Sequence, residues 1–169
     1  MSNKTKFISE FEDFLHSKEK GILITGTNQY MKHQLVMALF EKKYMNKSIL
    51  FRTNSMGNIT HCDYLGWAEV NKQPKAGEYI PIGNNYYQFD SMNNKGTWNK
   101  TALEFDFAIV YPVDSLCRNK NIEPIQELFE FKNIGKIVLC SWSESFNYDY
   151  SIFDKFISRH IVYDIENDD

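Results

Sequence analysis

The chain has 169 residues, of which 43% are hydrophobic and 15% are aromatic. This composition excludes disorder as the default state, and the length is enough to bury a hydrophobic core. No apolar run in the sequence approaches the roughly 20 residues that a transmembrane helix needs. The polar N-terminus lacks the features of a secretory signal, so we expect a cytoplasmic protein with no membrane partner.

The formal net charge of −3 is distributed unevenly along the chain. Residues 1–60 carry nine Lys and Arg against five Asp and Glu, whereas residues 101–169 carry six against thirteen. Because phosphate affinity comes largely from Lys and Arg, the chain as a whole is not typical of a basic nucleic-acid binder. The basic N-terminal part leaves a nucleic-acid partner open.

Three cysteines, Cys62, Cys117 and Cys140, are scattered through the sequence. An odd and sparse set suits a reducing compartment and does not suggest a disulfide framework. None of them has the paired spacing of a zinc site, and we predict no metal ligands among them.

The first elements along the chain are a helix, a strand, a second helix and a second strand. Apolar residues at helical spacing predict an amphipathic helix over residues 4–18. Residues 22–25 then predict a buried strand, and a helix follows that ends near residue 46. Residues 48–52 predict the next strand, so the segment 22–52 has the order and size of a βαβ unit.

Residues 53–104 interrupt this alternation. They hold five of the eight glycines and two of the four prolines. The stretch 79–89 resembles a β-hairpin that turns at Gly83-Asn84-Asn85. We therefore interpret residues 53–104 as an irregular, β-containing and aromatic-rich insertion.

The insertion also supplies the candidates for contact with a partner. Exposed aromatic side chains dominate interface hot spots, whereas buried ones only pack over the edge of a sheet. The sequence leaves both interpretations open. The four candidates are Trp67, Tyr86, Tyr87 and Trp98.

The alternation of strands and helices resumes after the insertion. Residues 107–111, 136–140 and 160–163 predict three further strands. Pro124 predicts the start of a helix, and a short helix is expected around residues 152–157. Residues 1–169 are therefore expected to form one α/β domain, with a mainly parallel sheet of about five strands and helices on both faces.

The loop between the first strand and the second helix carries the strongest motif. It runs Gly26-Thr27-Asn28-Gln29-Tyr30-Met31-Lys32-His33. Gly26 and Lys32 match the first glycine and the lysine of the pattern GxxxxGK[ST]. Met31 replaces the second glycine, and His33 replaces the Ser or Thr. With the order of elements over about two thirds of the chain, this loop resembles the P-loop NTPase superfamily.

The resemblance implies a nucleotide- or anion-binding site with altered chemistry. Its residues would be Gly26, Thr27, Asn28, Lys32 and His33 from the loop, with Asp114 and Ser141 from the ends of later strands. The backbone N–H groups and Lys32 still attract an anion. Imidazole, however, is a poor substitute for the hydroxyl that holds Mg²⁺.

The strand over residues 107–111 is similarly altered. In the superfamily an acid closes this strand and helps to hold Mg²⁺, whereas this sequence has Tyr111 there and Asp114 three residues later. Two parts of the phosphoryl-transfer machinery are thus replaced together, so we expect no hydrolysis and assign no catalytic residue.

The favoured function is a non-hydrolysing, P-loop-like module that binds a protein or nucleic-acid partner and has no certain cofactor. A composition rich in Asn, Lys, Ile and Tyr suggests a phage, plasmid or other mobile element of a low-GC bacterium. One alternative is a working NTPase that binds ATP or GTP with Mg²⁺ through Lys32 and Asp114. Another is a metal-dependent nuclease that uses Asp114, Glu130 and Lys132.

Overall fold

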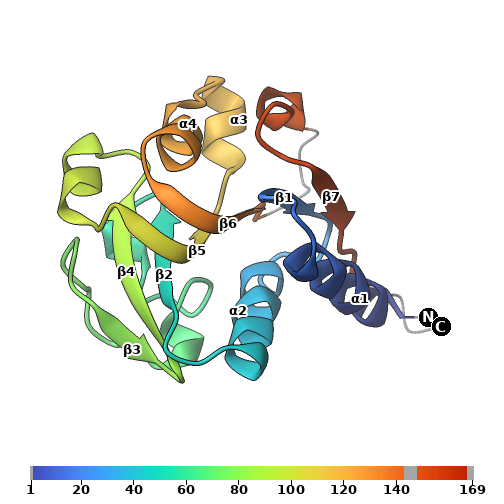
Figure 1. Ribbon diagram of the computed structural model, residues 1–169, viewed down its shortest axis with the longest axis horizontal. Coiled ribbons are helices and arrows are strands. Elements are labelled where there is room, and N and C mark those ends of the chain that lie inside the picture. The colour runs from blue at the N-terminus through green and yellow to red at the C-terminus, as the bar shows by residue number, and fades with distance from the viewer. Residues whose placement is uncertain (1, 143–147, 167–169) are drawn as a thin grey trace.

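A computed structural model describes residues 2–142 and 148–166, which form a seven-stranded sheet in the order β3-β4-β2-β5-β6-β1-β7 (Figure 1). The strands from β4 to β7 in this order run parallel to one another, and β3 pairs antiparallel with β4. The predicted α/β class with a mainly parallel sheet is therefore confirmed.

The elements follow the predicted order closely. The strands are β1 (Gly21–Thr25), β2 (Ser48–Thr53), β3 (Ile80–Ile82), β4 (Asn85–Ser91), β5 (Glu104–Val110), β6 (Asn133–Cys140) and β7 (Arg159–Val162). The α-helices are α1 (Asn3–His16), α2 (Lys32–Lys43), α3 (Asp114–Asn119) and α4 (Glu123–Glu130). Four 3₁₀ helices complete the set: η1 (Met56–Asn58), η2 (Gly66–Ala68), η3 (Lys95–Lys100) and η4 (Tyr150–Phe153).

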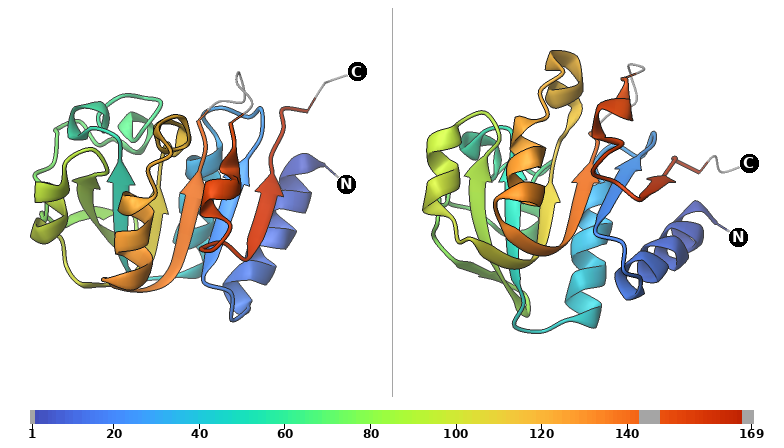
Figure 2. Two further views of the ribbon diagram at one scale, coloured as in Figure 1. Left: turned by 90° about the horizontal axis from the view of Figure 1, so that it is seen from above. Right: turned by 45° about the horizontal axis from the view of Figure 1, so that its top comes forward.

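Helices cover both faces of the sheet. Helices α1 and α2 lie on one face, and α3, α4 and η4 lie on the other (Figure 2). Side chains alternate between the faces along each strand, so Ile22 and Ile24 of β1 join the core under α1 and α2, whereas Leu23 joins the core under α3 and α4. Both faces of the central strands are buried, which explains their continuous apolar runs.

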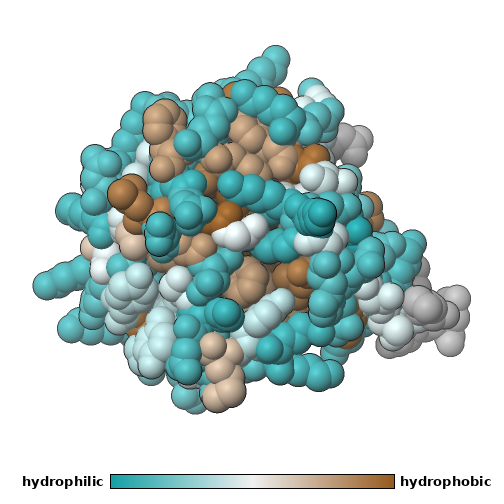
Figure 3. Space-filling view, in the orientation of Figure 1, coloured by the Kyte–Doolittle hydropathy of each residue, from teal (hydrophilic) through white to brown (hydrophobic). Residues whose placement is uncertain are grey.

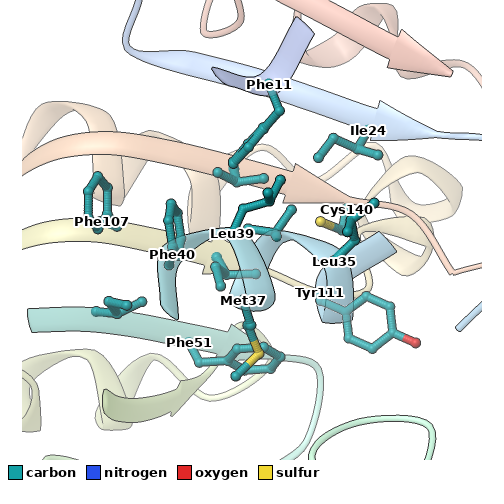
Figure 4. Packing of buried hydrophobic residues seen from close by; sticks show 14 of the residues in the cluster. Phe11, Ile24, Leu35, Met37, Leu39, Phe40, Phe51, Phe107, Tyr111 and Cys140 are labelled. Atoms are coloured by element: carbon teal, nitrogen blue, oxygen red, sulfur yellow. The ribbon is translucent and has the colours of Figure 1, made fainter. Parts of the chain in front are cut away.

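Aromatic side chains dominate the core under α1 and α2. The rings of Phe40 in α2 and Phe107 in β5 stack with their centroids 4.4 Å apart (Figure 4). Phe7 and Phe11 fill the space between α1 and the sheet, and both are buried. The apolar face predicted for this helix is thus the face that packs on the sheet. The Ser2 side chain caps the first turn of α1.

The aromatic-rich segment contributes two strands to one edge of the sheet. Its predicted hairpin is present, with Ile82 opposite Asn85 and Gly83 at a φ of 60° in the turn. Strand β4 then pairs in parallel with β2, so the sheet has two more strands than the five expected.

A buried ion pair ties β4 to β2. The Arg52 guanidinium donates from Nε to Oδ1 of Asp90 over 2.7 Å and from Nη2 to Oδ2 over 2.8 Å, and both side chains are fully buried. Arg52 Nη1 donates to Pro124 O over 2.8 Å, which adds α4 to the same network. The Trp98 ring covers the guanidinium at 4.6 Å. Two parallel charge-assisted bonds give this contact both strength and a fixed geometry.

Most of the surface in the view of Figure 3 is hydrophilic, and apolar side chains appear there in separate patches. Among residues 2–142 and 148–166, no helix has both the length and the apolar character needed to cross a bilayer.

Removing one partner of the buried pair tests its importance. Asp90→Ala removes the two-bond carboxylate partner of Arg52 and leaves its buried charge with the single contact to Glu127 at 3.1 Å. We therefore expect the free energy of unfolding to fall by about 3 kcal/mol, the lower end for a broken buried ion pair. Lys95→Ala is the matched control, because the Lys95–Glu123 pair is exposed and such pairs contribute at most about 1 kcal/mol. Urea denaturation of both variants measures the difference. Equal losses would contradict the assigned role of Arg52 and Asp90.

Candidate functional site

The candidate site lies where the carboxyl ends of parallel strands meet. The loop from Gly26 to Met31 joins β1 to α2, and β1 lies between β6 and β7. Ser141 directly follows β6, and Asp114 opens α3 shortly after β5. Ligands of open α/β sheets bind at this edge, in the crevice where the chain connections diverge to either side.

The start of the loop is fastened to the segment that follows β7. Gly26 has a φ of 121°, and a Cβ atom there would lie 2.2 Å from Tyr163 O. The Asn28 N–H donates to the same Tyr163 carbonyl over 3.2 Å. The Thr27 N–H donates to Asp164 Oδ1 over 3.0 Å. A glycine is therefore required at position 26 by both backbone conformation and close packing.

Lys32 lies beneath the loop. Its side chain is fully buried, and Nζ donates to Asn28 O over 2.9 Å and to Trp142 O over 3.4 Å. No side chain caps the start of α2, whose N-cap residue is Met31. The first N–H groups of α2 and the Lys32 ammonium together favour a negative charge at this end of the helix.

Asp114 and Ser141 lie just after the ends of β5 and β6. The Asp114 carboxylate is buried and accepts from the Trp142 N–H over 2.8 Å. Ser141 is also buried, and its N–H donates to Ile24 O over 2.9 Å. Trp142 therefore contacts both charged groups, Lys32 through its carbonyl and Asp114 through its N–H. The structure thus groups the lysine and the acid that the sequence paired.

His33 lies in an aromatic cluster under the loop. Its ring is fully buried and stacks on the Tyr111 ring with centroids 3.9 Å apart and an interplanar angle of 20°. Nε2 lies 2.6 Å from Tyr64 O, so it carries the proton and donates. Nδ1 is buried and has no hydrogen-bond partner among the described residues. Trp67 and Phe51 meet the imidazole edge-on.

The environment of His33 keeps its imidazole neutral. Burial lowers the pKa of His33 from 6.5 to about 4, and the Lys32 charge acts in the same direction. The hydrogen bond to Tyr64 O and the charge of Asp63 partly oppose this shift in the pKa. Tyr111 is fixed on the other side of the stack, because its hydroxyl donates to Asp63 O over 3.0 Å.

The four aromatic contact candidates separate into two pairs. Trp67 and Tyr86 are 38% and 46% exposed, so both can meet a partner. Tyr87 and Trp98 are only 2% and 7% exposed, so each packs mainly inside the fold and offers a partner little surface. Tyr87 stacks on Phe89, and Trp98 packs on the Arg52 guanidinium while its indole N–H donates to Ser91 O.

The residues of the nuclease pattern belong to different networks. The Lys132 ammonium is buried and donates to Trp98 O, Thr101 Oγ1 and Ala102 O. Glu130 is exposed and accepts from Gln126 on the same helix. Asp114 instead bonds to Trp142 at the loop. Within the described parts of the chain, no three His, Cys, Asp or Glu side chains form a group suited to a metal ion.

Two contacts of the site are not predicted by the sequence. The first is the stack of His33 on Tyr111, which joins residues 78 positions apart in the chain. The bond from Thr27 to Asp164 depends on β7 lying beside β1. Asp164, directly after the last predicted strand, is the signal that the sequence offers for this bond. Its contact with Thr27 can be expected only once β7 is known to lie beside β1.

A search of solved structures finds a similar fold in the large terminase of a thermophilic bacteriophage. The TM-score is 0.59 at 8% sequence identity, and the match covers 96% of this chain and 45% of that chain. The chain therefore spans less than half the length of that terminase. At this identity the likeness concerns the fold alone, and it supports the P-loop-like α/β fold. No family model and no curated protein sequence matches the chain.

The neutral His33 makes stability depend on pH. The unfolded chain binds a proton at His33 near pH 6.5, whereas the folded protein resists this until about pH 4. Stability is therefore lost as the pH falls through this window, by up to about 3 kcal/mol at about 1.4 kcal/mol per pH unit.

The variant His33→Phe keeps an aromatic ring in the stack and removes the titrating group. Urea denaturation of both proteins from pH 7 to pH 4 isolates the contribution of His33, since other groups titrate in both. We expect the wild type to lose more stability than the variant over this range. Parallel pH profiles would contradict a buried, neutral His33.

Proposed function

We propose that this chain is a P-loop-like binding module that does not hydrolyse nucleoside triphosphates. The stack of His33 on Tyr111, at 3.9 Å, is the observation that carries the proposal. In the superfamily that the sequence resembles, these two positions hold the hydroxyl and the acid that bind Mg²⁺. Here they hold two aromatic rings in mutual contact.

Such a stack is a poor environment for Mg²⁺. The ion requires near-octahedral oxygen ligands at about 2.0–2.1 Å. The ring nitrogens of His33 give none, and the Tyr111 hydroxyl is bonded to Asp63 O. Without a bound metal, the charge that develops on a transferring phosphoryl group lacks its main stabiliser.

The loop itself supports a role in binding an anion. The N–H groups at the start of α2 and the Lys32 ammonium beneath them favour a phosphate or another anionic group. Neither feature requires Mg²⁺. A phosphate-bearing ligand would therefore act here as a bound effector rather than as a substrate.

The surface beside α2 supports a protein partner. Trp67 lines two neighbouring cavities of about 290 Å³ and 200 Å³, and Ala38 borders both. Met37, Ile82 and Tyr87 give the larger cavity a mainly apolar wall, which suits apolar side chains of a protein better than a nucleic-acid backbone. Likeness to a phage terminase and the Asn- and Lys-rich composition support an origin in a phage or another mobile element.

A working NTPase is the second candidate. Lys32 and Asp114 favour the NTPase, because both side chains bond to the backbone of the same residue, Trp142. In this alternative Asp114 would replace the acid that Tyr111 displaces.

Turnover measurements distinguish the two candidates. We expect phosphate release from ATP or GTP with Mg²⁺ to stay at background for the wild type and for Lys32→Ala. Mg²⁺-dependent release that is lost in Lys32→Ala and kept in Lys42→Ala would establish the NTPase instead. Lys42 is an exposed lysine on the same helix, and thermal denaturation of each variant confirms that it is folded.

A further inference from the structure

Thr27 is bonded to a carboxylate of its own chain. Its N–H donates to Asp164 Oδ1 over 3.0 Å, and its hydroxyl donates to the same oxygen over 3.3 Å. The Thr27 hydroxyl oxygen also accepts from the Ile165 N–H over 2.9 Å. One carboxylate oxygen thus takes both donors that Thr27 presents at the start of the loop.

Further bonds hold the segment from Tyr163 to Glu166 in this position. The Tyr163 carbonyl accepts from the Asn28 N–H, and the Asp164 carbonyl accepts from Asn3 Nδ2 over 3.2 Å. The Glu166 carboxylate accepts from the Asn3 N–H. The segment therefore contacts both the loop and the first turn of α1, and the Asp164 carboxylate lies against Thr27.

The charge of Asp164 is balanced by the N–H and hydroxyl of Thr27. Among the residues that the structure describes, no Lys, Arg or His forms an ion pair with this carboxylate, and the side chain is exposed. Its stabilising contacts are the two donors of Thr27. The Asp164 carboxylate accepts from a backbone N–H and a hydroxyl. A phosphate oxygen is bound by the same pair of donors.

We infer that the N–H and hydroxyl of Thr27 form an anion subsite, and that Asp164 is its internal occupant. The Asp164 carboxylate competes with the phosphate group of a ligand that enters the loop. The segment after β7 therefore lowers the affinity of the loop for such a ligand. This inference rests on the anion-binding role proposed for the loop and adds the residue that regulates it.

Competition predicts that affinity rises when Asp164 is removed. A hydrogen bond to a charged group is worth enough to change an equilibrium by about tenfold or more, and the exposure of Asp164 argues for the lower end. We therefore expect Asp164→Ala to bind inorganic pyrophosphate about tenfold more tightly than the wild type. Asp164→Asn keeps an acceptor but loses the charge, so its affinity should lie between the two.

The experiment is a calorimetric titration of the full chain with pyrophosphate, in the absence of Mg²⁺. Glu166→Gln is the control, since Glu166 is on the same segment but bonds to Asn3 rather than to the loop. Hydrogen exchange at the Thr27 amide gives an independent readout, because that N–H is released when Asp164 is replaced. Asp164→Ala should speed this exchange, and Glu166→Gln should leave it unchanged.

Two results would overturn the inference. Measurable binding that is equal in the wild type and Asp164→Ala would remove the competition and leave the anion-binding loop intact. No binding of pyrophosphate by any of the proteins would remove the anion role of the loop itself, and the competition with it.

Discussion

The parallel pairing of β1 with β6 on one side and β7 on the other is the constraint on which the site depends. This pairing aligns Ile24 with Cys140 and with Ile161, so three strands end at the same level of the sheet. The chain that leaves each end then contributes to one small region. The loop comes from β1, Ser141 and Trp142 from β6, and Asp164 from β7. No single segment of the sequence contains this group.

The site combines polar and aromatic parts that meet at the start of α2. The Lys32 ammonium donates to the carbonyl oxygens of Asn28 and Trp142. The ring of the next residue, His33, instead stacks on the Tyr111 ring. Successive helix residues point about 100° apart, so neighbours in sequence serve different environments. The uncapped start of α2 and the buried lysine therefore lie directly beside an aromatic cluster.

The sequence predicted the fold well because its signals are local. The apolar face of α1, the apolar runs of the central strands and the hairpin at Gly83 each depend on a short segment. The parallel pairing of β4 with β2, the burial of Trp98 on Arg52 and the contact of Asp164 with Thr27 depend on which strands are neighbours. That order is a property of the folded sheet, so aromatic composition alone could not separate contact residues from core residues.

We propose that the His33–Tyr111 stack replaces a magnesium site, and a paramagnetic ion can probe this position. Mn²⁺ occupies oxygen-rich Mg²⁺ sites and broadens the amide resonances of nearby residues. Nitrogen-15 spectra of the protein without nucleotide, so that ATP itself brings no Mn²⁺ to the loop, should therefore show no selective broadening at Thr27, Lys32 or His33 when Mn²⁺ is added at low concentration. Strong broadening confined to these amides, and reversed by excess Mg²⁺, would place a metal at the loop and contradict the replacement of the magnesium site by the aromatic stack.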